Sequence, residues 1–219
     1  MSSREDILGR VRAALHRNAG NAAAARVVMQ DALTRGRHGP KPAIDAAPAA
    51  LLERFRIKSE EQSTTVEVVA QESDVPAAVA RYLAAMKLPT SAVAWPALAA
   101  LDWAGAGLRV ECRGARDADL VGITGCFCAV AETGTLMMCS SPDTPAAVSL
   151  LPETHIAVVR ASRILAYMEE AWDLARKELG TLPRAVNFIS GPSRTGDIEQ
   201  TIVLGAHGPY RVHLVVVED

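Results

Sequence analysis

The chain has 219 residues, of which 49% are hydrophobic, and its formal net charge is −2. This length suits one α/β domain with an extension better than two independent domains. The near-neutral charge and the scattered arginines argue against a nucleic-acid interface. No stretch reaches the roughly 18 uncharged apolar residues that a membrane span requires, and the N-terminal segment lacks the apolar run of a signal peptide. We therefore expect a cytoplasmic protein.

Four cysteines, Cys112, Cys126, Cys128 and Cys139, fall within a short central segment. Cys126 and Cys128 are separated by a single residue, and the sequence contains no Cys-x-x-Cys pair. In a reducing compartment each cysteine is explained most simply as a small hydrophobe. We therefore expect neither a metal site nor an iron–sulfur cluster in this chain.

The sequence pattern over residues 1–50 predicts a helical arm followed by a linker. Ser2 or Ser3 is a candidate N-cap, and the apolar residues at positions 7, 8, 11, 14 and 15 share one stripe, as in an amphipathic helix. A second helix is expected over about 22–33, and the glycines and prolines between 36 and 48 predict a linker. These helices cannot bury both faces alone, so they pack either on their own core or on a partner.

From about residue 51 onward, the pattern alternates between helices and short apolar strands. Strands are expected at 66–70, 92–95, 108–112, 128–131, 135–139, 156–159, 185–189 and 211–217, and helices at 75–86 and 163–179. This order indicates a mostly parallel sheet covered on both faces. The glycines of Gly122-Ile123-Thr124-Gly125 lack the spacing of a nucleotide-binding fingerprint, and we interpret this segment as a turn. His155 and His213 are interpreted as structural.

Glu132 is the best single candidate for a reactive or ligand-binding carboxylate. It interrupts a largely apolar run within Ala131-Glu132-Thr133-Gly134-Thr135. A buried carboxylate without a partner is costly, so Glu132 is expected to be paired, hydrogen-bonded or exposed in a pocket. The alternative is a glutamate in a tight hairpin turn, capped by the hydroxyls of Thr133 and Thr135.

The segment 190–199 forms the second candidate site and is expected to be a loop behind a strand. In open α/β sheets, ligands bind where strands end at the carboxyl edge. Ser193, Arg194 and Thr195 offer donors to a carboxylate or phosphate, and Asp197 is a candidate N-cap of the next turn. Gly and Pro are also common in ordinary turns, so the alternative is a connecting loop with no binding role.

His207 lies between Gly205 and Gly208 and is a candidate acid or base near neutral pH. A hydrogen-bonded loop histidine is the alternative. If Glu132 and Arg194 meet, the pair would suit a small hydroxy or keto acid or a phosphorylated metabolite, although the two side chains would equally satisfy each other.

Three segments together closely resemble the motifs of the LUD-domain family: Ala-Glu-Thr-Gly-Thr-Leu at 131–136, Gly-Pro-Ser-Arg-Thr-Gly-Asp-Ile-Glu at 191–199, and Gly-Ala-His-Gly-Pro at 205–209. The resemblance covers about residues 60–219. It implies the three-layer α/β/α fold, with a mostly parallel sheet, that sugar-phosphate isomerases, CoA transferases and 5-formyltetrahydrofolate cyclo-ligase share. The positions that match the family's motifs are Glu132, Thr133, Gly134, Thr135, Gly191, Ser193, Arg194, Thr195, Asp197, Glu199, His207 and Gly208. Gly196, where relatives often have Ala, and the stretch 126–128 depart from the pattern.

The resemblance also implies a role as one component of a multi-subunit system that oxidises L-lactate to pyruvate, with the iron–sulfur clusters on partner subunits. The chain itself shows neither cluster-binding cysteine spacing nor a nucleotide fingerprint, so an oxidoreductase role would need such partners. Two alternatives remain. The chain is a stand-alone isomerase or acyl-transfer enzyme, with Glu132 as base or nucleophile toward a phosphorylated or CoA-linked metabolite, or it is a ligand-sensing domain.

Overall fold

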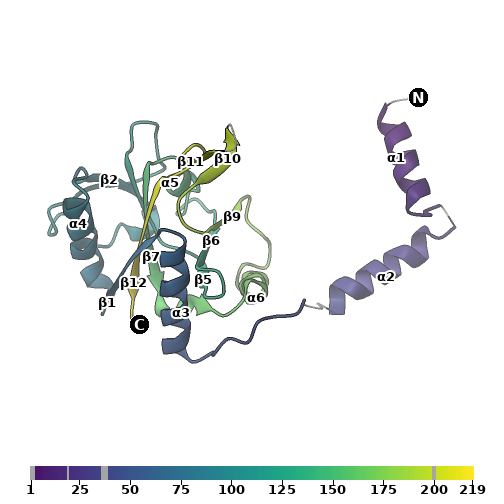
Figure 1. The fold of residues 1–219 in the computed structure, drawn as a ribbon, viewed down its shortest axis with the longest axis horizontal. Coiled ribbons are helices and arrows are strands. Elements are labelled where there is room, and N and C mark those ends of the chain that lie inside the picture. The colour runs from purple at the N-terminus through teal and green to yellow at the C-terminus, as the bar shows by residue number, and fades with distance from the viewer. Residues whose placement is uncertain (1–2, 19, 36–38, 199–200) are drawn as a thin grey trace. The chain divides into compact units, whose positions relative to one another are not determined.

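The structure is a computed structural model that describes residues 3–18, 20–35, 39–198 and 201–219, without the side chains of 196–198 and 201–203. Two compact units are present, Met1–Pro42 and Ala43–Asp219. Figure 1 shows the course of the chain through both.

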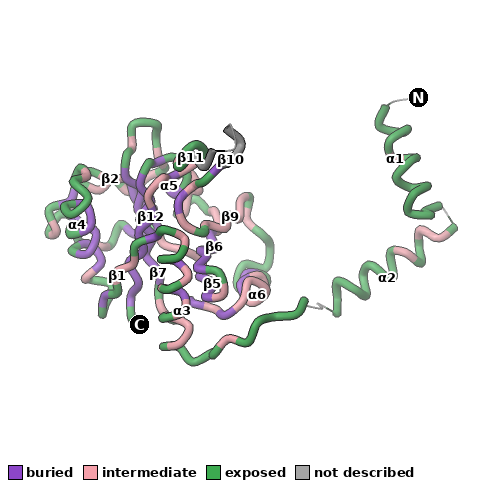
Figure 2. The backbone as a smooth tube through the Cα atoms, in the orientation of Figure 1, coloured by how far each residue is buried: buried purple, intermediate pink, exposed green. Residues whose placement is uncertain are grey.

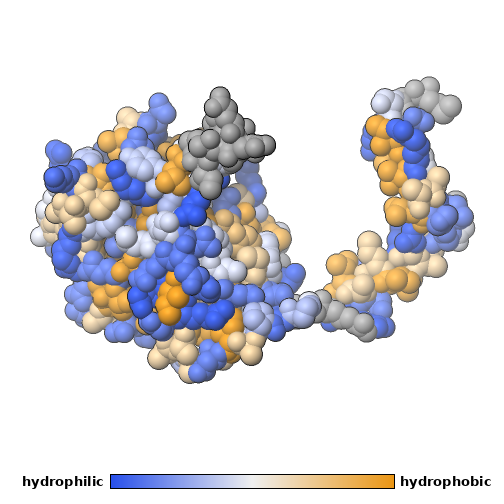
Figure 3. All heavy atoms as spheres, in the orientation of Figure 1, coloured by the Kyte–Doolittle hydropathy of each residue, from blue (hydrophilic) through white to orange (hydrophobic). Residues whose placement is uncertain are grey.

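The first unit contains the two predicted helices, α1 (Ser3–Ala14) and α2 (Ala22–Arg35). No residue of either helix is buried, as the green trace of Figure 2 shows. Apolar side chains therefore lie on the surface of the arm, where Figure 3 shows them in orange. The large exposed ones are Ile7, Val11, Leu15, Val27, Val28, Met29 and Leu33.

A six-stranded sheet forms the centre of the second unit, in the order β1-β12-β7-β4-β2-β3. All of its neighbouring strands are parallel, which confirms the predicted mostly parallel sheet. Its strands are β1 (Thr65–Val69), β2 (Ser91–Ala94), β3 (Arg109–Cys112), β4 (Val121–Thr124), β7 (Thr154–Arg160) and β12 (Arg211–Val217).

The turn predicted at 122–125 is wrong, because residues 121–124 form the fully buried strand β4. Gly122 explains why the segment does not look like a strand in sequence. A Cβ at this position would lie 2.1 Å from the carbonyl oxygen of Val148, so a helix packs directly on the strand backbone. A glycine that indicates a turn in isolation is here a site of close packing.

A second sheet of four strands lies beside the central one, in the order β8-β5-β6-β9. Its strands are β5 (Cys128–Val130), β6 (Thr135–Cys139), β8 (Ile164–Leu165) and β9 (Val186–Ile189). Ala129 and Leu136 belong to the main core, whereas Cys128 and Met137 pack with α6 (Met168–Leu179) in a separate cluster. The second sheet therefore lies between the main core and α6. The helix predicted from residue 163 begins five residues later, after β8.

The remaining helices cover the central sheet. They are α3 (Pro48–Glu61), α4 (Val75–Ala85) and α5 (Ala147–Leu150), with short 3-10 helices at Glu72–Asp74, Pro96–Leu98 and Ala161–Arg163. In Figure 1, α4 lies on one side of the central sheet, and the second sheet and α6 lie on the other. Among the described residues, no helix has the length and apolar character needed to cross a bilayer.

Two histidines lie inside the central sheet, as expected of structural residues. His155 Nε2 is 2.8 Å from the hydroxyl of Thr124, and His213 Nδ1 is 2.8 Å from that of Thr65. The His213 ring also stacks on Tyr82 of α4, with ring centroids 3.9 Å apart. Burial lowers the pKa of both histidines to about 4, because the imidazolium form would lose its hydration.

Gly134 allows the turn between β5 and β6 to lie against the backbone of α3. Its φ is +65°, and a Cβ there would lie 2.6 Å from both the carbonyl carbon of Lys58 and the amide nitrogen of Ser59. Neither backbone atom can move without displacing the helix. Position 134 therefore excludes side chains both by conformation and by lack of space.

We predict that Gly134→Ala lowers the free energy of unfolding by more than Gly180→Ala does. Both glycines have φ +65°, but a Cβ at Gly180 meets nothing within 4 Å, so the control isolates the conformational cost of about 1 kcal/mol. The contact with α3 should add about 1–3 kcal/mol. Urea denaturation of the two variants measures the difference, and equal losses would contradict the contact.

The buried histidines should make stability fall as the pH drops from about 6.5 to about 4. In this window the unfolded chain takes up protons that the folded chain refuses, so folding becomes less favourable, by at most about 3 kcal/mol for each histidine. Denaturation curves at pH 7.5, 6, 5 and 4.5 measure the slope. His155→Gln should reduce it, because that variant lacks one of the two buried imidazoles. A flat profile over this range would contradict the prediction.

Candidate functional site

Two of the sequence motifs meet at the C-terminal end of α3. The turn of Gly134 lies on Lys58 and Ser59, and a Cβ on Gly191 would lie 2.4 Å from the carbonyl oxygen of Gln62. Lys58 and Gln62 are separated by only about 6 Å along a helix. The structure thus brings together segments 131–135 and 190–194, which are far apart in sequence, on one helix end.

Three hydroxyls link the two segments directly. Thr133 Oγ1 is 2.7 Å from Thr135 Oγ1, which is 2.6 Å from Ser190 Oγ. Thr135 is buried, while Thr133 and Ser190 at the two ends of the chain of hydroxyls are exposed. The end hydroxyls are therefore accessible to a ligand, and the middle one fixes their positions.

Arg194 begins β10 (Arg194–Ile198) and extends back to the end of α3. Its Nη2 donates to the carbonyl oxygen of Gln62 at 3.1 Å and to the hydroxyl of Ser63 at 2.6 Å. The side chain is exposed, and it forms no ion pair with Glu132. The alternative in which these two charges neutralise each other does not hold. The sequence did not indicate Gln62 and Ser63 as site residues. Their only sequence signal is that they lie in a short polar segment between a helix and a strand.

Glu132 lies in the turn that closes the β5–β6 hairpin, where Val130 is opposite Thr135. Its backbone N–H donates to the carbonyl of Ala166 at 3.1 Å, and its side chain is half-buried. The hairpin alternative is therefore correct for the backbone, but the threonine hydroxyls bind each other and Ser190 rather than cap the carboxylate. The Glu132 carboxylate makes no hydrogen bond or ion pair to another described residue.

The Gly205–Pro209 loop packs on Ser193. The Ser193 N–H donates to the carbonyl of Pro209 at 2.8 Å, and the N–H of Gly205 donates to the carbonyl of Ser193 at 2.9 Å. His207 is exposed in this loop. No hydrogen bond joins it to Glu132 or Arg194, all three of which are described, so an acid–base role for His207 remains a prediction.

The position of segment 190–199 differs from the prediction in two respects. Ser63 precedes β1 and the Gly205–Pro209 loop precedes β12, so this segment lies at the amino edge of the central sheet and not at its carboxyl edge. Residues 194–198 also form a strand, paired with β11 (Thr201–Leu204), so Asp197 is not a helix N-cap. Buried Thr195 lies in this strand, and Glu199 is outside the described residues. The hairpin depends on backbone pairing with β11, which the residue types of β10 alone did not indicate.

Chemically, the two segments present a guanidinium, a carboxylate and hydroxyls that both donate and accept. Arg194 retains the N–H groups of Nε and Nη1 beyond those its two bonds to α3 use, and the exposed hydroxyls add further donors. Glu132 supplies a carboxylate able to accept a proton or hydrogen bond. Such a set suits a small molecule that bears both a carboxylate and a hydroxyl or carbonyl group.

The cysteines lie elsewhere. Cys126 lies before β5 and packs against the main core, whereas Cys128 begins β5 and belongs to the cluster around α6. Burial raises the pKa of both thiols to about 12, so they are poor nucleophiles. Within the described part of the chain, no three His, Cys, Asp or Glu side chains converge as a metal site would require.

Known proteins share both the sequence and the fold. The chain is 42% identical over 102 residues to Lactate utilization protein C of Bacillus subtilis (strain 168), an alignment that covers 45% of this chain and 42% of the relative. It is 43% identical over 101 residues to the protein of the same name from Shouchella clausii, covering 45% and 44%. The alignments thus span less than half the length of these relatives.

A crystal structure of a DUF162 family protein from Deinococcus radiodurans has the same fold. It superimposes with a TM-score of 0.62 at 26% identity, covering 79% of this chain and 99% of that one. The LUD domain matches residues 52–217, which include the whole central sheet and all three sequence motifs. The chain belongs to the LUD domain family.

Proposed function

We propose that this chain acts in lactate utilization, as a non-redox subunit of an assembly that oxidises L-lactate to pyruvate. The observation that carries the proposal is the meeting of segments 131–135 and 190–194 at the end of α3, where three hydroxyls are linked and Arg194 binds Ser63. Two relatives that are named for lactate utilization support a role of this chain in the same process.

In this proposal, L-lactate binds at the end of α3. The Nε and Nη1 donors of Arg194 take the carboxylate, a charge-assisted contact that fixes its orientation. Glu132 accepts the proton of the C2 hydroxyl as that carbon is oxidised. The hydroxyls of Thr133 and Ser190 hold the substrate oxygen in place.

The electrons must then pass to another component, because oxidation of lactate to pyruvate releases two electrons and two protons. We propose that this chain contributes substrate binding and, through Glu132, takes the hydroxyl proton, while partner subunits that would carry iron–sulfur clusters take the proton from C2 and the two electrons. The exposed apolar residues of α1 and α2 offer a surface through which such an assembly would form.

The test is dye-linked oxidation of L-lactate by the assembly purified from the host organism, with and without this chain. Omission should abolish activity, and the wild-type chain should restore it. Glu132→Gln and Arg194→Ala should each lower the rate at least about tenfold, because each removes one interaction with the reacting molecule.

Control variants distinguish the loss of a site residue from a general effect of replacing a charged surface residue. Glu111→Gln and Arg81→Ala remove a surface carboxylate and a surface guanidinium that are paired elsewhere, and both should keep wild-type activity. Full activity without the chain would refute the proposal. Turnover of a phosphorylated or CoA-linked metabolite by the isolated chain would replace it with the stand-alone enzyme alternative.

A further inference from the structure

A cavity of about 660 Å³ opens at the carboxyl edge of the central sheet, opposite the edge that carries the family motifs. The residues that follow β2 and β4, Trp95 and Gly125, line it together with Arg160 at the end of β7. Ser140 behind β6 and Leu179 at the end of α6 form the facing wall. None of the motif residues lines this cavity.

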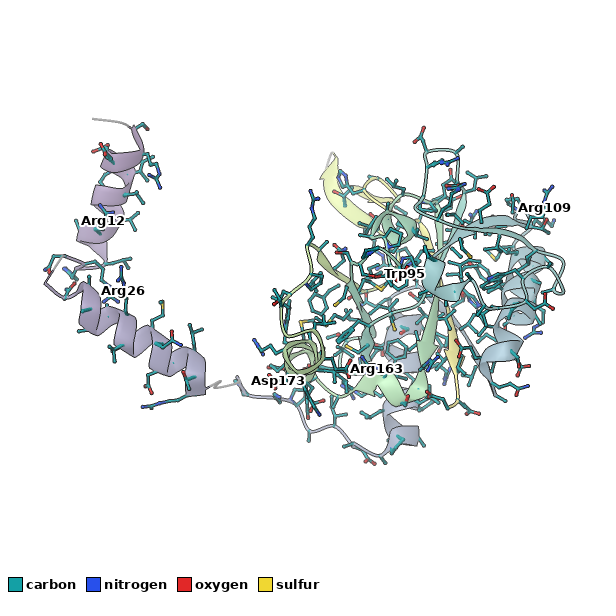
Figure 4. The ribbon with its side chains drawn as sticks, turned by 180° about the vertical axis from the view of Figure 1, so that it is seen from behind. Arg12, Arg26, Trp95, Arg109, Arg163 and Asp173 are labelled. Carbon is teal, nitrogen blue, oxygen red and sulfur yellow. The ribbon has the colours of Figure 1, made fainter. Side chains whose placement is uncertain are left out.

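The cavity lies where the strand order of the sheet reverses. From β2 the chain moves outward to β3 and then returns across β2 to β4, so the connections after β2 and β4 leave in opposite directions. This arrangement opens a crevice outside the carboxyl ends of the two strands, where open α/β sheets bind ligands. Figure 4 shows Trp95 and Arg163 in this part of the unit, with α6 beside Arg163.

The charged groups of the cavity are not equivalent. Arg163 is held by three hydrogen bonds: Nη1 and Nη2 donate to Glu178 at 2.7 and 2.9 Å, and Nε donates to the carbonyl of Phe127 at 3.0 Å. To other described residues, the Arg160 side chain makes a single hydrogen bond, from Nη2 to Glu72 at 2.8 Å, and both side chains of this pair are about half exposed. Such a pair is weak, so Arg160 is the guanidinium available to a ligand.

Other polar groups of the wall also favour a ligand that accepts hydrogen bonds. Ser140 Oγ already accepts a hydrogen bond from the N–H of Ala185 at 3.0 Å, which leaves its O–H to donate. Both carboxylate oxygens of Glu178 are taken by Arg163. Ser141, Thr144 and Thr181 add further hydroxyls, and the apolar part of the wall is formed by Trp95, Leu98, Val158 and Leu179.

The volume sets the size of the ligand. A water molecule occupies about 30 Å³ in the liquid, so a cavity of 660 Å³ corresponds to roughly 20 waters, and a three-carbon acid would leave most of it empty. We propose that this cavity binds an organic anion larger than lactate, with an aromatic or alicyclic body and one carboxylate, sulfonate or phosphate group. The anionic group lies at Arg160, and the body lies along Trp95 and Leu98.

The test uses 1-anilinonaphthalene-8-sulfonate, a fluorescent anion of this chemical class, titrated against the full chain. Arg160→Gln should raise the dissociation constant about three- to tenfold. Glu72→Gln should lower it, because the carboxylate that competes for Arg160 is gone. This opposite sign distinguishes the proposal from a simple loss of folding, which would weaken binding in both variants. Arg81→Gln, another exposed and paired arginine, is the control and should bind as the wild type does.

Amide shifts in ¹H–¹⁵N spectra locate the bound anion. Shifts at Gly125 and Phe127 on addition of the probe would support the proposal. Shifts confined to residues 3–35, or equal dissociation constants in the Arg160→Gln and Glu72→Gln variants, would overturn it. The proposal does not rest on lactate utilization, since its residues and its readout are independent of that activity.

Discussion

The contact between Gly134 and the backbone of α3 is the constraint on which the motif site depends. With no side chain at position 134, the β5–β6 turn lies directly on Lys58 and Ser59, and Gly191 approaches Gln62 in the same way. The end of α3 therefore sets the distance between Glu132 on one segment and Arg194 on the other. A site assembled from three segments needs such a rigid element, because loops alone would not hold its groups in register.

The two edges of the central sheet present different chemistry. At the amino edge, polar groups from three segments gather around the end of α3 and are suited to a small acid. At the carboxyl edge, the reversal of strand order opens an apolar cavity with one accessible guanidinium. Between them, the sheet is buried on both faces, with His155 and His213 held uncharged inside it. The strands thus separate two polar environments by an apolar layer.

Much of the fold follows from local patterns. The apolar runs that became β1, β2, β7 and β12 are readable because burial imposes its period on the sequence. The strand β4 was missed, since Gly122 looks like a turn residue until Val148 is known to pack on it. The strand β10 was missed because its mostly polar residues carry little strand signal of their own, and its formation depends on pairing with β11.

By itself, the sequence determined the parallel sheet, the helical arm, the family and the identity of the motif residues, because these depend on composition, period and local motif. Only the tertiary structure decided which edge of the sheet the motifs occupy, that Arg194 binds Gln62 and Ser63 rather than Glu132, and that a cavity lies at the opposite edge. The physical reason is that each of these depends on contacts between segments far apart in the chain. Such contacts are fixed by the packing of helices on sheets and leave no periodic trace in the residues that make them.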